Sequence, residues 1–126
     1  MLGLVDGQVI INNQNIALVP NSVERRYGRG ETTVATQSLG AGNVDTVHSV
    51  DNTTAKSYFK FSMKVTQENI DAVDAWKLNL GANVIRYIGT DSNEIYEQMS
   101  VINDPTYPDS NDAVIEVEFE GNPLIK

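Results

Sequence analysis

The chain has 126 residues and no cysteine, so it is the length of one ordinary domain and excludes disulfides and cysteine-based metal sites. Its formal charge of −8 argues against a protein that binds nucleic acid by neutralising phosphates, because that requires clustered lysine and arginine. The first residues carry no basic stretch before an apolar run, so we expect neither a signal peptide nor a membrane-spanning segment.

Alternating apolar and polar residues, typical of half-buried strands, dominate the sequence and predict its elements in chain order. The N-terminal part predicts a hairpin in which residues 9–11 and 16–19 are strands joined by an asparagine-rich turn. Residues 20–22 end this hairpin. Residues 23–27 are expected to be extended, and the two glycines within residues 28–30 should bend the chain.

A second hairpin is predicted in the middle of the chain. Residues 31–38 are rich in threonine and valine, which favours a strand, and residues 39–43 predict a flexible, glycine-containing tip. Residues 44–50 predict the returning strand, with Val44, Thr46, His48 and Val50 on one face and Asp45, Val47 and Ser49 on the other. Residues 51–54 predict a turn, and the strand that follows has a buried face formed by Phe59, Phe61, Met63 and Val65.

One helix is predicted, and it begins after Thr66. Thr66 is a suitable N-cap, Glu68 complements the positive helix start, and Gly81 can adopt the left-handed conformation that ends a helix. The apolar residues at helical spacing are Ile70, Val73, Trp76 and Leu80. Such a stripe is stable only when it packs on another surface, so we expect the helix to lie against a sheet.

The C-terminal third predicts strands at residues 83–88, 94–103 and 114–120, with a turn at residues 90–93 and a polar loop at residues 104–112. The last strand has the clearest alternation, since Ile115, Val117 and Phe119 alternate with Glu116, Glu118 and Glu120. The elements together predict a mainly β fold: a single domain, residues 1–126, built as an antiparallel β-sandwich or barrel with one flanking α-helix.

Five segments, in this order, resemble the tail tube proteins of contractile-tailed bacteriophages, a family related to tube proteins of phage-tail-like particles and type VI secretion systems. They are the hairpin ending at residues 20–22, the bend at residues 27–32, the tip around Ser38, Gly40 and Gly42, residues 59–62 with the helix start at 66–70, and residues 76–77 with the helix end at 81–85. They span roughly residues 16–119.

The resemblance implies a structural protein and no enzyme, with no catalytic residues, metal or cofactor. In the family, subunits form hexameric rings, and the rings stack into a hollow tail tube that conducts DNA into the host without binding it specifically. The implied partners are further copies of the chain, the tail sheath protein, the baseplate and the tail terminator proteins. The implied location is the tail of the virion, after assembly in the host cytoplasm.

Acidic side chains on a bore would repel DNA, so acidic residues of the strands at 94–103 and 114–120 are candidates for lining the lumen. The sharpest candidates are Glu116, Glu118 and Glu120, and an ordinary solvated outer face is the alternative. The only basic cluster consists of Arg25, Arg26 and Arg29, which we expect to contact a neighbouring subunit or the sheath.

In the family, the segment corresponding to residues 39–52 contacts the adjacent ring. The candidate residues for this contact are Leu39, Gly40, Gly42, Asn43 and Asn52. A loop that becomes ordered only on stacking would prevent premature polymerisation, so deleting residues 39–52 is expected to leave a folded subunit that forms no tubes.

Two functions of other classes stay open at this point. A carbohydrate-binding β-sandwich module is the main alternative, with Trp76 and the tyrosines as a sugar platform, although helical spacing places Trp76 on the buried stripe. An enzyme on a small β-barrel is less favoured because His48, the only histidine, has no evident catalytic partners. Asp104, Asp109, Asn111 and Asp112 could bind calcium, but they lack EF-hand spacing.

Overall fold

The computed structural model describes residues 7–89 and 92–124. Residues 1–6, on which the expectation of no signal peptide rests, lie outside the described residues, and so do Thr90 and Asp91 of the predicted turn. The strands are β1 (Gln8–Ile11), β2 (Gln14–Ile16), β3 (Glu24–Arg26), β4 (Glu31–Gly40), β5 (Asn43–Asp51), β6 (Ser57–Lys64), β7 (Asn83–Ile88), β8 (Asn93–Val101) and β9 (Val114–Gly121). The helices are α1 (Gln67–Leu78) and a short 3-10 turn, η1 (Asn52–Thr54).

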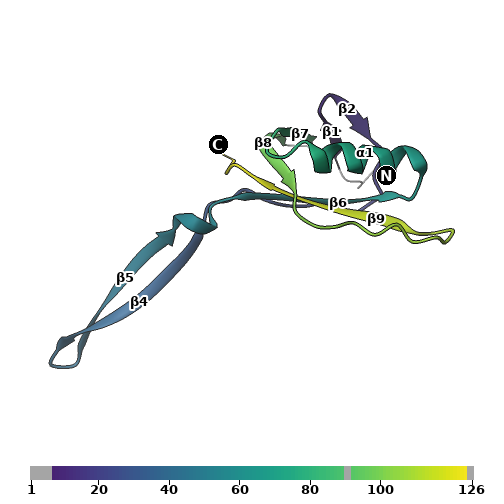
Figure 1. Cartoon of the computed structure of the whole chain (residues 1–126). Helices are drawn as coiled ribbons and strands as arrows, with labels where there is room; N and C mark the ends of the chain where they lie inside the picture. The colour runs from purple at the N-terminus through teal and green to yellow at the C-terminus, as the bar shows by residue number, and fades with distance from the viewer. Residues whose placement is uncertain (1–6, 90–91, 125–126) are drawn as a thin grey trace.

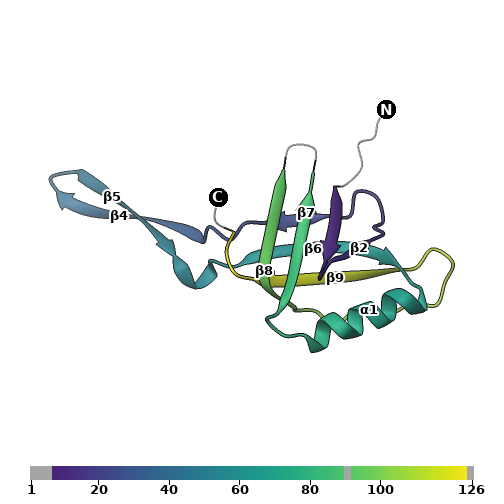
Figure 2. The same cartoon turned by 90° about the horizontal axis from the view of Figure 1, so that it is seen from above.

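Seven of these strands form the body of the molecule, in the antiparallel order β2-β1-β7-β8-β9-β6-β3. The order folds over on itself, so that β1, β7 and β8 cross above β6 and β9, as Figure 2 shows. Among the described strands, the two ends of the order, β2 and β3, do not pair with each other. The predicted antiparallel sandwich with one flanking helix is therefore confirmed, and the body is an open sandwich and not a closed barrel.

The strand β8 carries the chain from one layer to the other. It pairs with β7 between Asn93 and Met99, whereas Ser100 and Val101 pair with β9. The register with β7 shifts between Tyr96 and Met99, and Gln98 has a positive φ of 54°, which marks a β-bulge. The extra residue changes which side chains point inward, so strict alternation along residues 94–103 does not describe this strand.

The core lies between the two layers and is closed on one side by α1 (Figure 1). The inward alternation predicted for β6 and β9 is confirmed, and rings from both strands meet the helix. Trp76 of α1 lies 6.0 Å from the ring of Phe61 and 5.8 Å from that of Phe119. The fully or nearly buried apolar residues are Val9, Ile11, Phe59, Phe61, Met63, Val73, Trp76, Ile85, Tyr87, Tyr96, Met99, Val101, Ile115, Val117, Phe119 and Leu124.

The helix begins and ends largely as the sequence predicts. The side chain of Thr66 accepts a hydrogen bond from the Asn69 backbone N–H at 3.1 Å, and Gly81 has a φ of 68°. The prediction for Leu80 is wrong, because α1 ends at Leu78 and leaves Leu80 73% exposed beyond the helix. The described residues contain no helix that is both long and apolar enough to cross a membrane.

The first hairpin is also confirmed, although its second strand is shorter and begins earlier than predicted. Asn12 and Asn13 both have positive φ, of 51° and 69°, and form a two-residue turn of the type that matches strand twist. This turn places β2 at Gln14–Ile16 instead of residues 16–19. Val19 lies beyond the strand, where its N–H donates to the carbonyl of Ser62 at 2.9 Å.

The burial of Trp76 predicts a large loss of stability for Trp76→Ala, about 3–5 kcal/mol, because a ring packed between two phenylalanines leaves a cavity. The matched control is Leu80→Ala, which removes an exposed side chain and should change the unfolding free energy by less than about 0.5 kcal/mol. Urea unfolding measures the difference in stability between the two variants. Circular dichroism follows both variants, and tryptophan fluorescence also follows the control. Equal losses in the two variants would contradict this assignment of the core.

Candidate assembly site

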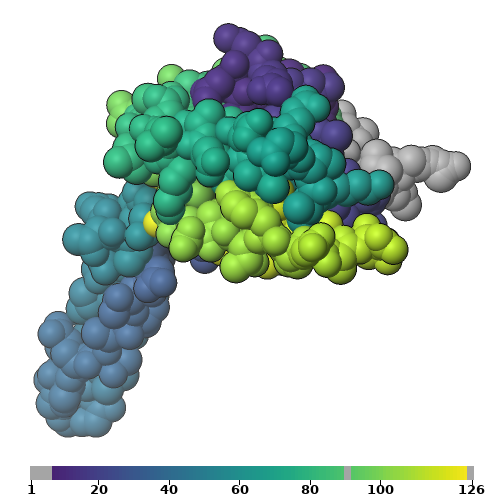
Figure 3. Space-filling view, turned by 45° about the vertical axis from the view of Figure 1, so that its right-hand side comes forward, coloured from purple at the N-terminus to yellow at the C-terminus, as the bar shows by residue number. Residues whose placement is uncertain are grey.

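A two-stranded hairpin, β4 and β5 with their connecting turn, projects far from the body (Figures 1 and 3). We call this segment, residues 31–51, the arm. Within the described residues its strands pair only with each other, and every arm residue is exposed. A lone hairpin without a packed face is marginally stable in water. The arm therefore has the properties of a segment that another surface covers in an assembly.

The register of β4 and β5 gives the arm two chemically different faces, because directly opposed residues share a face. One face carries only uncharged residues, and we call it the uncharged face: Thr32, Val34, Thr36, Ser38, Val44, Thr46, His48 and Val50. The other, acidic face carries Glu31, Thr33, Ala35, Gln37, Asp45, Val47, Ser49 and Asp51. The predicted division of residues 44–50 between two faces is thus confirmed, and β4 extends it.

Two glycines fix the direction in which the arm leaves the body. Gly28 and Gly30 have φ values of +85° and +84°, which residues with a side chain rarely adopt. A Cβ on Gly28 would lie 2.6 Å from the carbonyl carbon of Lys56, and one on Gly30 would lie 2.8 Å from Cγ1 of Val50. The bend predicted from these glycines is present, and its backbone passes too close to the returning chain for any other residue.

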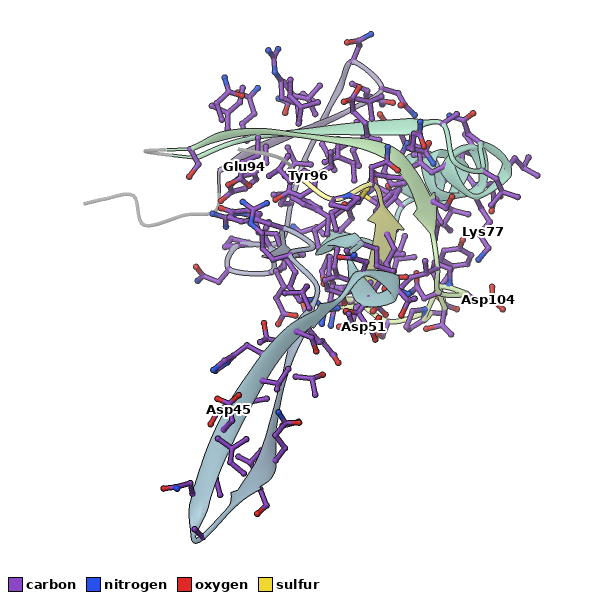
Figure 4. The ribbon with its side chains drawn as sticks, turned by 90° about the vertical axis from the view of Figure 1, so that its left-hand side faces the viewer. Asp45, Asp51, Lys77, Glu94, Tyr96 and Asp104 are labelled. Carbon is purple, nitrogen blue, oxygen red and sulfur yellow. The ribbon has the colours of Figure 1, made fainter. Side chains whose placement is uncertain are left out.

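The opposite root of the arm is held by Asp51. Its carboxylate accepts hydrogen bonds from the N–H and the hydroxyl of Thr53, at 3.0 and 2.6 Å, and these bonds lower the pKa of Asp51. The hydroxyl of Thr54 donates to the Asp51 carbonyl at 2.8 Å and accepts from the Glu31 N–H at 2.7 Å. The two strands are therefore tied together where they meet the body. Figure 4 shows Asp51 at this root and Asp45 farther along the arm.

A buried carboxylate lies beside the same root and joins the two layers. Glu94 of β8 is 1% exposed, and it accepts hydrogen bonds from Arg25 Nε at 2.9 Å, from Tyr96 at 2.7 Å and from Tyr27 (Figure 4). Arg25 belongs to β3 and also lies over the ring of Tyr87, 4.6 Å from its centroid. This cluster fixes the edge strand β3, and with it the chain that enters the arm, to the opposite layer.

The cluster keeps Glu94 ionised. Burial by itself raises the pKa of Glu94, but the hydroxyls of Tyr27 and Tyr96 and the charge of Arg25 together lower it below its ordinary value. Burial and the neighbouring carboxylate raise the pKa of Tyr96, so this hydroxyl stays a donor. Acidic residues within the segment 94–103 are candidates for lining a bore. For Glu94 this prediction is wrong, because its side chain points into the protein.

The predicted basic cluster divides between internal and external roles. Arg25 is bound to Glu94, and Arg29 donates to the Leu124 carbonyl. Arg26 is exposed and lies over the ring of Tyr58, 4.2 Å from its centroid. Arg25 and Arg29 thus contribute to holding the body together, which the sequence alone did not indicate, and both Arg26 and Arg29 are exposed at the surface.

The predicted lumen-lining glutamates all lie on the outer face of β9, and each has a neighbour on the strand or turn beside it. Glu116 lies 3.9 Å from the ammonium of Lys60, and Glu120 lies 3.1 Å from that of Lys56. Glu118 accepts a hydrogen bond from the hydroxyl of Tyr58 at 2.6 Å. The row is therefore partly neutralised by lysines of the same face.

The residues predicted for contact between rings lie at two separate places. Leu39, Gly40, Gly42 and Asn43 lie at the tip of the arm, whereas Asn52 lies in η1 at its root. The segment 39–52 is also no irregular loop, since most of it is β5. His48 is exposed on the uncharged face of the arm, opposite Val34.

Two alternatives from the sequence can be compared with this geometry. Trp76 is 3% exposed, so its ring is not available as a platform for a sugar. Within residues 7–89 and 92–124, no three histidine, aspartate or glutamate side chains gather closely enough to hold a metal ion. The loop with Asp104 and Asp109 connects β8 and β9 and is exposed at these carboxylates.

Comparison with known proteins finds similarity among solved structures. No protein-family model and no curated protein matches the chain. A chain in a solved structure described as "Cryo-EM Structure of an Extracellular Contractile Injection System, PVC sheath-tube complex in extended state" has a TM-score of 0.57 at 16% identity. The match covers 99% of this chain and 90% of that chain. The protein therefore has the fold of a component of a contractile sheath-tube complex, in agreement with the resemblance to contractile tail tube proteins.

The Glu94 cluster predicts that Glu94→Gln destabilises the body by about 2 kcal/mol at pH 7, since a buried charged hydrogen-bond network loses its acceptor while the partly exposed Arg25 can be hydrated. The folded-state pKa of Glu94 lies below its ordinary value of 4.5, so the carboxylate stabilises the fold fully above that pH. This contribution is lost as the pH falls through the folded-state pKa.

The measurement is urea unfolding of wild type and Glu94→Gln between pH 7 and pH 3. The difference in unfolding free energy between the two proteins should narrow as the pH falls. Glu97→Gln, an exposed change on the same strand, is the matched control and should stay close to wild type throughout. A gap that is constant with pH would show that the charge of Glu94 does not stabilise the fold.

The arm root predicts that Gly30→Ala loosens the arm while the body stays folded, because the new Cβ meets Val50 and the Asp51 carbonyl. Gly42→Ala is the control, since Gly42 also has a positive φ, +79°, but no atom within 4 Å of the new Cβ. Hydrogen exchange of the arm amides should accelerate much more in Gly30→Ala. Equal acceleration in both variants would mean that backbone strain alone, and not the close approach, matters.

Proposed function

We propose that this protein is a structural subunit of a contractile-type tail tube, with no enzymatic role. Copies form hexameric rings, and the rings stack into a hollow tube that conducts DNA during infection. The observation that carries the proposal is the arm: an exposed hairpin, fixed at its root, on a body whose fold is that of a component of a contractile sheath-tube complex.

The surfaces of the body fit such an assembly. Closed rings use heterologous interfaces, in which one face of a subunit meets a different face of its neighbour. The edge strands β2 and β3 are short, which limits uncontrolled pairing and leaves edges that a neighbour's strands can extend. In this proposal the arm, with the tip residues Leu39, Gly40, Gly42 and Asn43, contacts the adjacent ring. Of the predicted cluster of Arg25, Arg26 and Arg29, the exposed Arg26 and Arg29 are proposed to contact a neighbour or the sheath.

The outer face of β6 and β9 is proposed as the wall of the bore. A cationic wall would retain the phosphates of DNA, whereas Glu116, Glu118 and Glu120 give this face an acidic row. Lys56 and Lys60 moderate that row. A wall of nearly balanced charge neither binds DNA tightly nor opposes its entry strongly, and both properties suit a conduit.

The proposed partners are other copies of the chain, a tail sheath protein, a baseplate and a tail terminator protein. The proposed location is the tail of a virion assembled in the host cytoplasm. The matched structure comes from an extracellular contractile injection system, so a phage-tail-like particle is the related setting in which the same subunit would act.

Electron microscopy of the purified protein tests this proposal. We expect hollow tubes of stacked rings with six-fold symmetry, and a reconstruction should place the row of Glu116, Glu118 and Glu120 on the bore. A protein that stays monomeric at high concentration, in the presence and absence of seed tubes, would contradict the proposed function.

A variant without the arm provides the matched comparison. Replacing residues 32–50 with an Asn-Gly turn joins Glu31 to Asp51, which are already opposed, and retains the root. We expect thermal unfolding close to that of wild type and no tubes. Deleting residues 39–52 is a less clean change, because it would leave β4 without its partner and remove Asp51. Tubes of normal length from the armless variant would contradict the role of the arm.

A further inference from the structure

A short segment after β9 runs back toward the root of the arm. In Figures 1 and 2 the chain that follows β9 leaves the sheet on the side of the body from which the arm projects. A Cβ on Gly121, the last residue of β9, would lie 2.5 Å from Sδ of Met99 and 2.6 Å from the carbonyl oxygen of Gln98. The bulge of β8 therefore fixes where this segment begins. We call residues 122–124 the strap.

The strap is bound to the body at both of its ends. At its start, the N–H of Asn122 donates to the carbonyl of Glu97 at 3.2 Å. At its other end, Leu124 is 9% exposed and belongs to the apolar core. A segment that follows the last strand of a fold is ordered only where specific contacts hold it. These contacts give the strap one path, from β8 to the connection between β3 and the arm.

Leu124 binds this connection through two backbone groups. Its N–H donates to the carbonyl of Tyr27 at 2.8 Å, and its carbonyl accepts a hydrogen bond from the guanidinium of Arg29. The same guanidinium lies 5.4 Å from the centroid of the Tyr27 ring. Between Tyr27 and Arg29 lies Gly28, one of the two glycines at the arm root. One residue of the strap thus holds the chain on both sides of the bend.

The bend at the root determines the direction of the arm. Within the described residues β4 and β5 pair only with each other, so no strand of the body supports the arm along its length. The hydroxyl of Tyr27 is bound to Glu94, but a ring held at one end still allows the backbone at its other end to turn. The strap holds the backbone carbonyl of the same residue. It therefore supplies the second constraint that a fixed direction requires.

We propose that the strap fixes the direction of the arm. While Leu124 is bound to Tyr27 and Arg29 the arm keeps one orientation, and release of the strap lets the arm turn about its root. This is a property of a single molecule. Its consequence for assembly rests on the proposed function: an arm with many orientations loses more conformational entropy when it docks, so a subunit with a released strap joins a tube less readily.

Spin labels on the arm and on the body measure the spread of arm directions in the monomer. The chain has no cysteine of its own, so Gln37→Cys on β4 and Ala75→Cys on α1 provide two exposed labelling sites. Pulsed electron paramagnetic resonance gives the distribution of distances between the two labels. In the labelled chain without further changes we expect one narrow distribution.

Deleting residues 123–126 removes Leu124 and is expected to widen this distribution. The matched control is deletion of residues 125–126, which retains both groups of Leu124 that form the hydrogen bonds. Its distribution should stay as narrow as that of the full chain.

Arg29→Ala is an independent second variant, since it removes one bond to the strap and leaves the buried side chain of Leu124 in place. We expect a smaller widening than after the deletion. Arg26→Ala is its control, because Arg26 is also exposed but lies over the ring of Tyr58. Thermal unfolding followed by circular dichroism shows which variants are folded. If the deletion prevents folding, Arg29→Ala alone decides the outcome.

Two results would overturn the proposed role of the strap. A narrow distribution in every folded variant would assign the direction of the arm to the glycines and the Glu94 cluster alone. Equal widening in a variant and its control would mean that the bonds of Leu124 are not the cause. Tube formation is a separate measurement. If wild-type protein forms no tubes, the proposed function fails, whereas the distance distributions of the monomers still decide the role of the strap.

Discussion

The structure depends on the packing between the layer of β6 and β9 and the layer of β1, β7 and β8, with α1 closing one side. The arm contributes no buried residue to this core. Ordering its backbone still costs conformational entropy, of the order of 1–2 kcal/mol per residue before hydrogen bonding is counted. The body must therefore be stable without help from the arm, and it achieves this with a dense set of aromatic contacts around Phe61, Phe119 and Trp76.

The Glu94 cluster shows how a stable body can hold an exposed arm in one direction. Tyr27 lies in the short connection between β3 and the glycines of the arm root, and it donates to a carboxylate anchored in the other layer. Gly28 then passes against the backbone of Lys56 and Ser57. A displacement of β3 would consequently change the direction of the whole arm. The buried polar network therefore fixes the orientation of the arm as well as stabilising the body.

Much of the fold could be predicted because its signals are local. The alternation in β6 and β9 reports burial directly, and Thr66 and Gly81 bracket the helix through the conformation of their own residues. The hairpin of the arm was also predictable, since threonine-rich and valine-rich strands surround two glycines. These features depend on neighbouring residues, and a single sequence contains that information.

Most of the errors have causes outside the local sequence. Glu94 has the appearance of a surface residue until its partner Arg25, far away in sequence, is placed beside it by the folding of the sheet. The bulge at Gln98 depends on the register with β7, and the exposure of Leu80 depends on where α1 stops. Strand pairing decides the environment of Glu94 and the bulge at Gln98, and composition does not reveal it. The exposure of Leu80 instead follows from the position of the helix end.

The exposed arm also has a consequence for the timing of assembly. A free subunit presents valines that favour association, while its charge of −8 makes two approaching copies repel each other. Repulsion acts over the Debye length, about 8 Å at physiological salt, whereas apolar contact acts only at touching distance. In the proposed assembly this balance is a kinetic barrier: isolated copies stay apart, and addition is favoured at a growing end where several contacts form at once.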